Sequence, residues 1–138
     1  MIAIGKITEK IDTRVLLSTL WIVVMINMLK ADILSLYIPG VQEQLVKFAG
    51  DTPITQLMLG GAIMMEISIA MIFLSRVLTY WVNRWTNIIT SLITIVFVIG
   101  GGSTYPHYIF IAAIEVVCLL LIARIAWKWS NHEVLLKP

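Results

Sequence analysis

The sequence predicts an all-α integral membrane protein, a single domain (residues 1–138) built as a bundle of four membrane-spanning helices. Hydrophobic residues make up 59% of the 138-residue chain. Charged residues make up only 13%, about half the share that is usual in soluble domains. Four apolar runs approach or exceed the roughly 20 residues that a helix needs to cross a bilayer. A spanning segment must also bond its own backbone groups internally, which a helix does.

The four spans are predicted at residues 15–38, 54–78, 85–99 and 108–129. The second span follows Thr52 and Pro53, a pair typical of a helix start. Between the first two spans, "VQEQLVKFAG" has its apolar residues on one helical face, which predicts a short helix at the membrane interface. We expect a tight turn at "TYWVNR" and a loop at "GGGSTYPH", which is rich in helix breakers.

The distribution of lysine and arginine predicts the orientation of the chain. One side of the membrane has only Lys47, apart from Lys30 inside the first span. The other side has eight basic residues: Lys6, Lys10, Arg14, Arg76, Arg84, Arg124, Lys128 and Lys137. Because basic residues accumulate on the inner side, both termini are expected in the cytoplasm.

Three carboxylates interrupt the apolar spans: Asp32, Glu66 and Glu115. A charged side chain at the centre of a span costs about 2.5–3.5 kcal/mol on insertion scales, so intramembrane carboxylates usually serve a function. At the rise of an α-helix, Asp32 and Glu115 should lie about 9–10 Å from the outer surface and Glu66 about 18 Å. We therefore expect the three to meet in one shielded pocket, where they bind a ligand or a proton.

The third span carries a polar face. Asn87, Thr90, Ser91 and Thr94 follow the i, i+3, i+4, i+7 spacing, whereas the intervening residues are aliphatic. This face should turn toward the other helices, and Asn87, Ser91 and Thr94 join the candidate ligand- or proton-binding residues. The alternative is that these hydroxyl groups only bond their own helix backbone. Lys30 either extends outward to the lipid headgroups or turns toward one of the carboxylates.

We predict no catalytic residue, no metal ligands and no cofactor. The sequence has no metal-ligand spacing, phosphate loop or dinucleotide motif. His107 and His132 fall on opposite sides of the membrane in this topology, so neither suits a general base in the bundle centre. The net charge of +2 gives no reason to expect nucleic acid as a partner.

The stretches "LLSTLWIVVMINMLKADILSLYIPG", "GGAIMMEISIAMIFLSRVLTYWVNRWTNII" and "YIFIAAIEVVCLLLIARIAWKW" resemble a family of small bacterial four-span membrane proteins of unknown function. The resemblance extends from about Arg14 to Trp129 and implies a location in the bacterial cytoplasmic (inner) membrane. It also marks a set of polar positions: Asp32, Glu66, Arg76, Asn83, Arg84, Asn87 and Glu115. The segment from Glu66 to Arg76 is similar to the DoxX-like proteins, which carry a glutamate in the second span before a helix that ends on arginine.

The sequence favours a protein that binds a small ligand or lipid in an acidic, outward-facing cavity, with proton-coupled transport as an extension of that role. The expected partners are membrane lipids, a small ligand with a cationic or hydroxyl group and, for transport, a second copy forming a homodimer. Two alternatives stay open. One is a non-enzymatic accessory or scaffold subunit of a larger membrane complex. The other is a small membrane enzyme acting on a lipid or isoprenoid, with a carboxylate as general acid or base.

Overall fold

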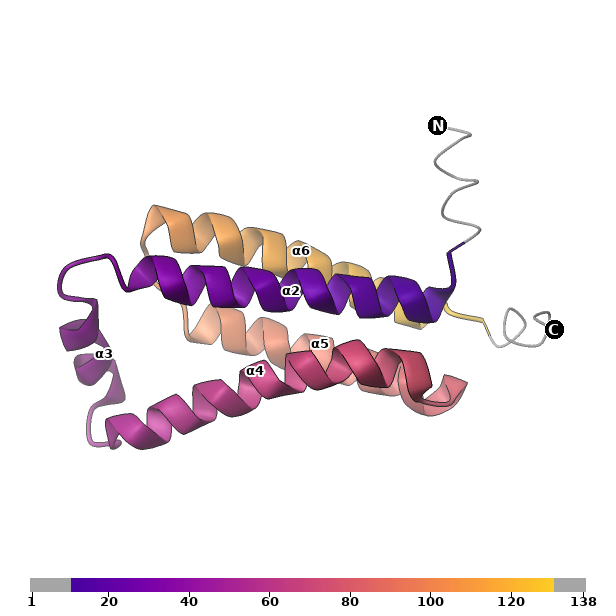
Figure 1. Cartoon of the computed structure of the whole chain (residues 1–138), viewed down its shortest axis with the longest axis horizontal. Helices are drawn as coiled ribbons and strands as arrows, with labels where there is room; N and C mark the ends of the chain where they lie inside the picture. The colour runs from indigo at the N-terminus through magenta and orange to yellow at the C-terminus, as the bar shows by residue number, and fades with distance from the viewer. Residues whose placement is uncertain (1–10, 131–138) are drawn as a thin grey trace.

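The computed structural model describes residues 11–130, which form five helices and no strand. Their bounds are α2 (Thr13–Ser35), α3 (Val41–Ala49), α4 (Ile54–Val77), α5 (Tyr80–Gly100) and α6 (Pro106–Lys128). All except α3 are long and apolar enough to cross a membrane. The long helices run along one another, and α3 lies across one end of the bundle (Figure 1). The prediction of an all-helical chain with four long apolar helices is therefore confirmed. Four residues named in the sequence analysis lie outside the described residues: Lys6, Lys10, His132 and Lys137.

The helix ends differ from the expected spans by more than two residues at two places. Helix α2 stops at Ser35 instead of residue 38, and the chain then turns through Gly40, whose φ of +83° favours glycine. Helix α5 begins at Tyr80 instead of residue 85, so most of "TYWVNR" is helical and the turn is confined to the residues just before it. The Tyr80 hydroxyl donates to the carbonyl of Trp129 (2.6 Å), which fixes the start of α5 against the end of α6.

Helix α5 is amphipathic with its polar face turned into the protein. Its buried residues are mostly polar: Asn83, Asn87, Thr90, Ser91 and Thr94, together with Ile88 and Val98. Its outer face is aliphatic and includes Ile89, Leu92, Ile93 and Val96. Lipid solvates aliphatic side chains well and polar ones poorly, so this arrangement suits a membrane. The predicted inward orientation of the polar face is confirmed.

The side-chain amide of Asn87 joins three helices. Its Oδ1 accepts hydrogen bonds from Trp21 Nε1 of α2 (2.8 Å) and Ser75 Oγ of α4 (3.2 Å). Its Nδ2 donates to the backbone carbonyl of Asn83 (2.9 Å) and to the Asn83 Oδ1 (2.7 Å). Asn83 in turn donates to the carbonyl of Ser75 (2.7 Å). The amide of Asn87 thus makes all four hydrogen bonds available to it.

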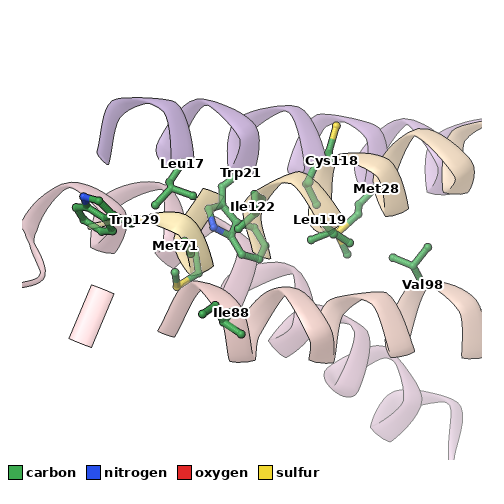
Figure 2. Close-up of a cluster of buried hydrophobic side chains, with 12 residues drawn as sticks. Leu17, Trp21, Met28, Met71, Ile88, Val98, Cys118, Leu119, Ile122 and Trp129 are labelled. Atoms are coloured by element: carbon green, nitrogen blue, oxygen red, sulfur yellow. The ribbon is translucent and has the colours of Figure 1, made fainter. Parts of the chain in front are cut away.

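Apolar side chains pack around this polar cluster. Trp21, Leu17, Leu119 and Ile122 are fully buried, and Figure 2 shows them extending from α2 and α6 toward each other. Met71 of α4 and Ile88 of α5 belong to the same cluster. Because Trp21 lies in this apolar core, its indole N–H depends on Asn87 for a hydrogen bond.

Arginine side chains hold the helix ends opposite α3. The last carbonyls of a helix have no partner within the helix, and they attract cations. Arg84 donates to the carbonyl of Trp127 near the end of α6 (3.0 Å), and its guanidinium lies over the Trp85 and Trp127 rings. Arg14 donates to the carbonyl of Arg76 near the end of α4 (3.3 Å). These contacts close that end of the bundle.

Helix α4 leaves the bundle toward its start. It packs mainly against α2 and meets α5 at the end far from α3. Toward α3 it diverges from the other long helices (Figure 1). Its buried residues, Ser68, Met71 and Ser75, all lie in its second half. In its first half the large side chains Met58, Leu59 and Ile63 are exposed. The bundle is therefore tightly packed at one end only.

Replacing Asn87 with leucine should lower the free energy of unfolding by about 1–3 kcal/mol, because Trp21 Nε1 and Ser75 Oγ each lose a buried partner. Reversible unfolding of the purified protein in detergent measures this. The matched control is Ser91→Ala on the same buried face, since the Ser91 hydroxyl donates only to the carbonyl of Ile88 in its own helix (2.9 Å). Equal losses in both variants would contradict the assignment of Asn87 as the joint between helices.

Candidate functional site

A cavity of about 330 Å³ lies among the four long helices, in the half of the bundle nearer α3. Its wall includes Ala31 of α2, Gly61 of α4, Val98 of α5 and Glu115 of α6. These residues come from the late part of α2 and α5 and the early part of α4 and α6. The cavity therefore occupies the space that opens where α4 separates from the bundle.

Two carboxylates and a phenol supply the polar part of the wall. Glu115 is only 3% exposed, and its Oε1 is buried without a hydrogen-bond partner. Asp32 is exposed, lines the same cavity, and is close enough to Glu115 for the two groups to interact electrostatically. Tyr108 also lines the cavity, but its hydroxyl donates to the carbonyl of Val98 (3.1 Å). Of these three polar groups of the wall, only Glu115 has a buried polar atom without a hydrogen-bond partner.

The remaining wall is apolar and adaptable. Met28, Met58 and Met65 bring thioether side chains to it from α2 and α4. The Ser68 hydroxyl donates weakly to the sulfur of Met28 (3.8 Å). A Cβ added at Gly61 would meet no heavy atom within 4 Å, which shows open space beside that backbone. Flexible methionines around open space form a wall that can fit apolar groups of varied shape.

Glu66 does not join the other carboxylates. It is exposed and does not line the cavity, so the expectation that all three carboxylates meet in one pocket is wrong for this residue. The reason is helical geometry. Ser68, two residues later, is fully buried against the bundle, and two residues correspond to a rotation of about 200° around a helix. Glu66 therefore lies on the outer face of α4.

The polar candidates of α5 are buried but do not reach the cavity. Asn87 belongs to the cluster with Trp21, and the Thr94 hydroxyl donates to the carbonyl of Thr90 (2.7 Å). Ser91 likewise donates within its own helix. Of the six candidate residues, the structure brings only Asp32 and Glu115 to one cavity. For the two hydroxyl residues it supports the alternative that they bond the backbone.

Sequence reasoning missed Tyr108 as part of the site, since a tyrosine near a helix start suggests the aromatic belt at the membrane surface. It precedes Glu115 by seven residues, or about two helical turns, which places both on one face of α6. That spacing could have identified it. Met58 had no comparable signal, because methionine is common in apolar packing.

At the end of the bundle nearer α3, polar contacts join α3, the start of α6 and the end of α2. Tyr105 donates to Gln44 Oε1 of α3 (3.0 Å) and stacks on His107. The His107 ring lies 3.2 Å from Ser35 Oγ at the end of α2. Lys30 is exposed, as the outward alternative for this side chain requires. Within residues 11–130, no group of three or more His, Cys, Asp or Glu side chains is placed to hold a metal ion.

The fold and the cavity define a class: a helical protein with four candidate membrane spans and an acidic cavity among them. A family model described as "Family of unknown function (DUF6326)" matches residues 5–135, and the chain belongs to that family. The resemblance to a family of unknown function is thereby confirmed. No curated protein and no solved structure matches the chain.

Proposed function

We propose that this protein binds a small amphipathic ligand in the cavity, with a cationic or hydroxyl group directed at Glu115. One observation carries the proposal: the Glu115 Oε1 is buried, lines a cavity and has no hydrogen-bond partner. Buried polar atoms are nearly always hydrogen-bonded, so an exception calls for an explanation. A ligand that donates a hydrogen bond to Glu115 supplies one.

The wall chemistry supports a ligand with a polar head and an apolar body. A cavity of about 330 Å³ is at the lower end of the range of roughly 300–1,000 Å³ for small-molecule sites. Beyond the carboxylates, the wall consists largely of methionine, small and aromatic residues such as Met58, Ala62 and Phe97. These side chains stabilise an apolar chain and offer little to a fully polar solute.

Proton exchange follows from the same geometry. An ionised carboxylate away from water is unstable unless a proton or a positive group neutralises it. In the proposed cycle Glu115 holds a proton when the cavity is empty and exchanges it for the cationic group of the ligand. Asp32, at the exposed side of the cavity, gives the ligand and the proton a polar entrance. Such an exchange is the elementary step of proton-coupled transport.

We also propose the finer location and orientation of the chain. Arg14, Arg76 and Arg84 gather at the end of the bundle opposite α3, which supports a cytoplasmic position for that end and for both termini. The cavity then opens on the outer side of a bacterial cytoplasmic membrane. A DoxX-like relationship stays a proposal based on the segment from Glu66 to Arg76.

The ligand proposal is tested with three compounds that share one chain: n-octylammonium, n-octanol and octanoate. The first two should raise the thermal stability of the wild-type protein in detergent, and octanoate should not, because its carboxylate has no proton to donate to Glu115 and no lysine or arginine among the described residues lines the cavity to neutralise it. A free ligand concentration of about 100 times Kd would add about 2.7 kcal/mol to the free energy of unfolding. In Glu115→Gln the stabilisation by the amine should fall strongly, while that by the alcohol should persist, because an amide still bonds a hydroxyl.

Two controls separate the cavity from general detergent effects. Gly60 and Gly61 both have open space around them, but only Gly61 lines the cavity. Gly61→Leu should reduce stabilisation by both compounds, and Gly60→Leu should not. Glu43→Gln removes an exposed carboxylate of α3 and should leave the response unchanged. A response of Glu115→Gln identical to wild type would overturn the proposal.

Thiol labelling in intact cells tests the orientation. The buried Cys118 is first replaced by alanine, and a cysteine is then placed at Gln42 in α3 or at Thr79 before α5, both of which are exposed. Gln42→Cys should react with a membrane-impermeant maleimide added outside, whereas Thr79→Cys should react only after the cells are permeabilised. The opposite pattern would reverse the proposed orientation.

A further inference from the structure

Glu66 is an ionisable side chain on an outward apolar surface. It is exposed and is the thirteenth of the 24 residues of α4. The other exposed large side chains of this helix are hydrophobic, except Gln56 near its start and Arg76 near its end. At helical rise it lies about 18 Å from the start of α4, close to the centre of a bilayer. Glutamate is too short to extend from there to the headgroups, as lysine and arginine do nearer the surface. A carboxyl group there needs a hydrogen-bonding partner outside this chain.

The surface around Glu66 has the spacing of a helix–helix seam. Exposed residues follow one another at intervals of four and three: Leu59, Ile63, Glu66, Ala70, Phe73 and Val77. This is the repeat that packs two helices in a left-handed coiled coil. Helix α4 is also the least covered of the long helices, with 11% of its most apolar stretch buried against 33–39% in the others.

We propose that α4 is the interface of a homodimer, in which Glu66 hydrogen-bonds to Glu66 of the partner subunit. In a dimer with a two-fold axis along the membrane normal, the same patch meets itself and equivalent residues lie at equal depth. A carboxylic acid both donates and accepts hydrogen bonds, so a pair of them is self-complementary. A second copy therefore places a carboxyl group, that of the partner's Glu66, at the same depth in the bilayer as Glu66. One polar residue in an apolar seam also fixes its register and partner number.

The observations behind this inference are separate from those behind the proposed ligand. Glu66 does not line the cavity, and the seam residues Leu59, Ile63 and Phe73 are likewise absent from its wall. Ligand binding can therefore fail while the dimer stands, and the reverse also holds.

Disulfide mapping in bilayers tests the interface. In a Cys118→Ala background, single cysteines at Ile63 or Phe73 should form a disulfide-linked dimer on mild oxidation of the reconstituted full chain. Val96→Cys on α5 and Phe110→Cys on α6 are matched controls, since both positions are exposed and apolar but lie off the seam. They should give no dimer band above background. Equal cross-linking at the control positions would overturn the interface.

The role of Glu66 is tested by self-association measured through energy transfer between labelled copies as lipid is added. Glu66→Leu should associate about tenfold more weakly, which corresponds to about 1.4 kcal/mol and is typical of an interhelical hydrogen bond. Glu66→Gln should associate nearly as wild type, because an amide pair can also donate and accept. Dimers of unchanged strength in Glu66→Leu would remove Glu66 from the interface. A wild-type protein that is monomeric in bilayers would overturn the proposal as a whole, whether or not Glu66→Leu folds.

Discussion

The buried amide of Asn87 is the interaction on which the arrangement of the helices depends. In a membrane the hydrophobic effect does not drive helices together, so packing and interhelical hydrogen bonds decide how they associate. Asn87 accepts from Trp21 of α2 and Ser75 of α4 and donates to Asn83 of its own helix. Rotating α2 or α4 away from this arrangement would remove the partner of the Trp21 indole N–H or of the Ser75 hydroxyl. The amide therefore fixes the rotation of α2, α4 and α5 at the end of the bundle away from α3.

The cavity lies in the other half of the bundle from the Asn87 hydrogen bonds, and its position follows from them. Because α4 is joined to α5 at Ser75 and diverges from it toward α3, the cavity forms in the half of the bundle nearer α3. The hydrogen bonding of the buried side chains Asn87 and Glu115 also differs between the two halves. Asn87 uses its whole hydrogen-bonding capacity, whereas Glu115 has a buried oxygen with no partner. The end of the bundle near Asn87 is thus closely packed around a fully hydrogen-bonded amide, whereas the end nearer α3 holds a cavity beside a carboxyl oxygen without a partner.

The sequence predicted the rotation of α5 but not that of α4, and the difference has a physical origin. Polar residues on α5 recur at helical spacing, so only one face can turn inward, as Thr94 and Ser91 do. Helix α4 is apolar nearly all around, so its sequence marks no preferred face. Glu66 was expected inside because it is polar, although Ser68 is the residue that packs on the bundle. The cavity itself depends on the divergence of α4, which no local pattern encodes.

The two proposals meet on α4. Residues of α4 such as Gly61 and Met65 line the cavity, while Ile63 and Glu66, in the same turns, face away from the bundle. The early half of α4 has little else to hold it, since its buried contacts begin at Ser68. A second copy packed on the outer face would fix the position of that half and with it the width of the cavity. Binding and association would then share one movable element, and each would change the equilibrium constant of the other by the same factor.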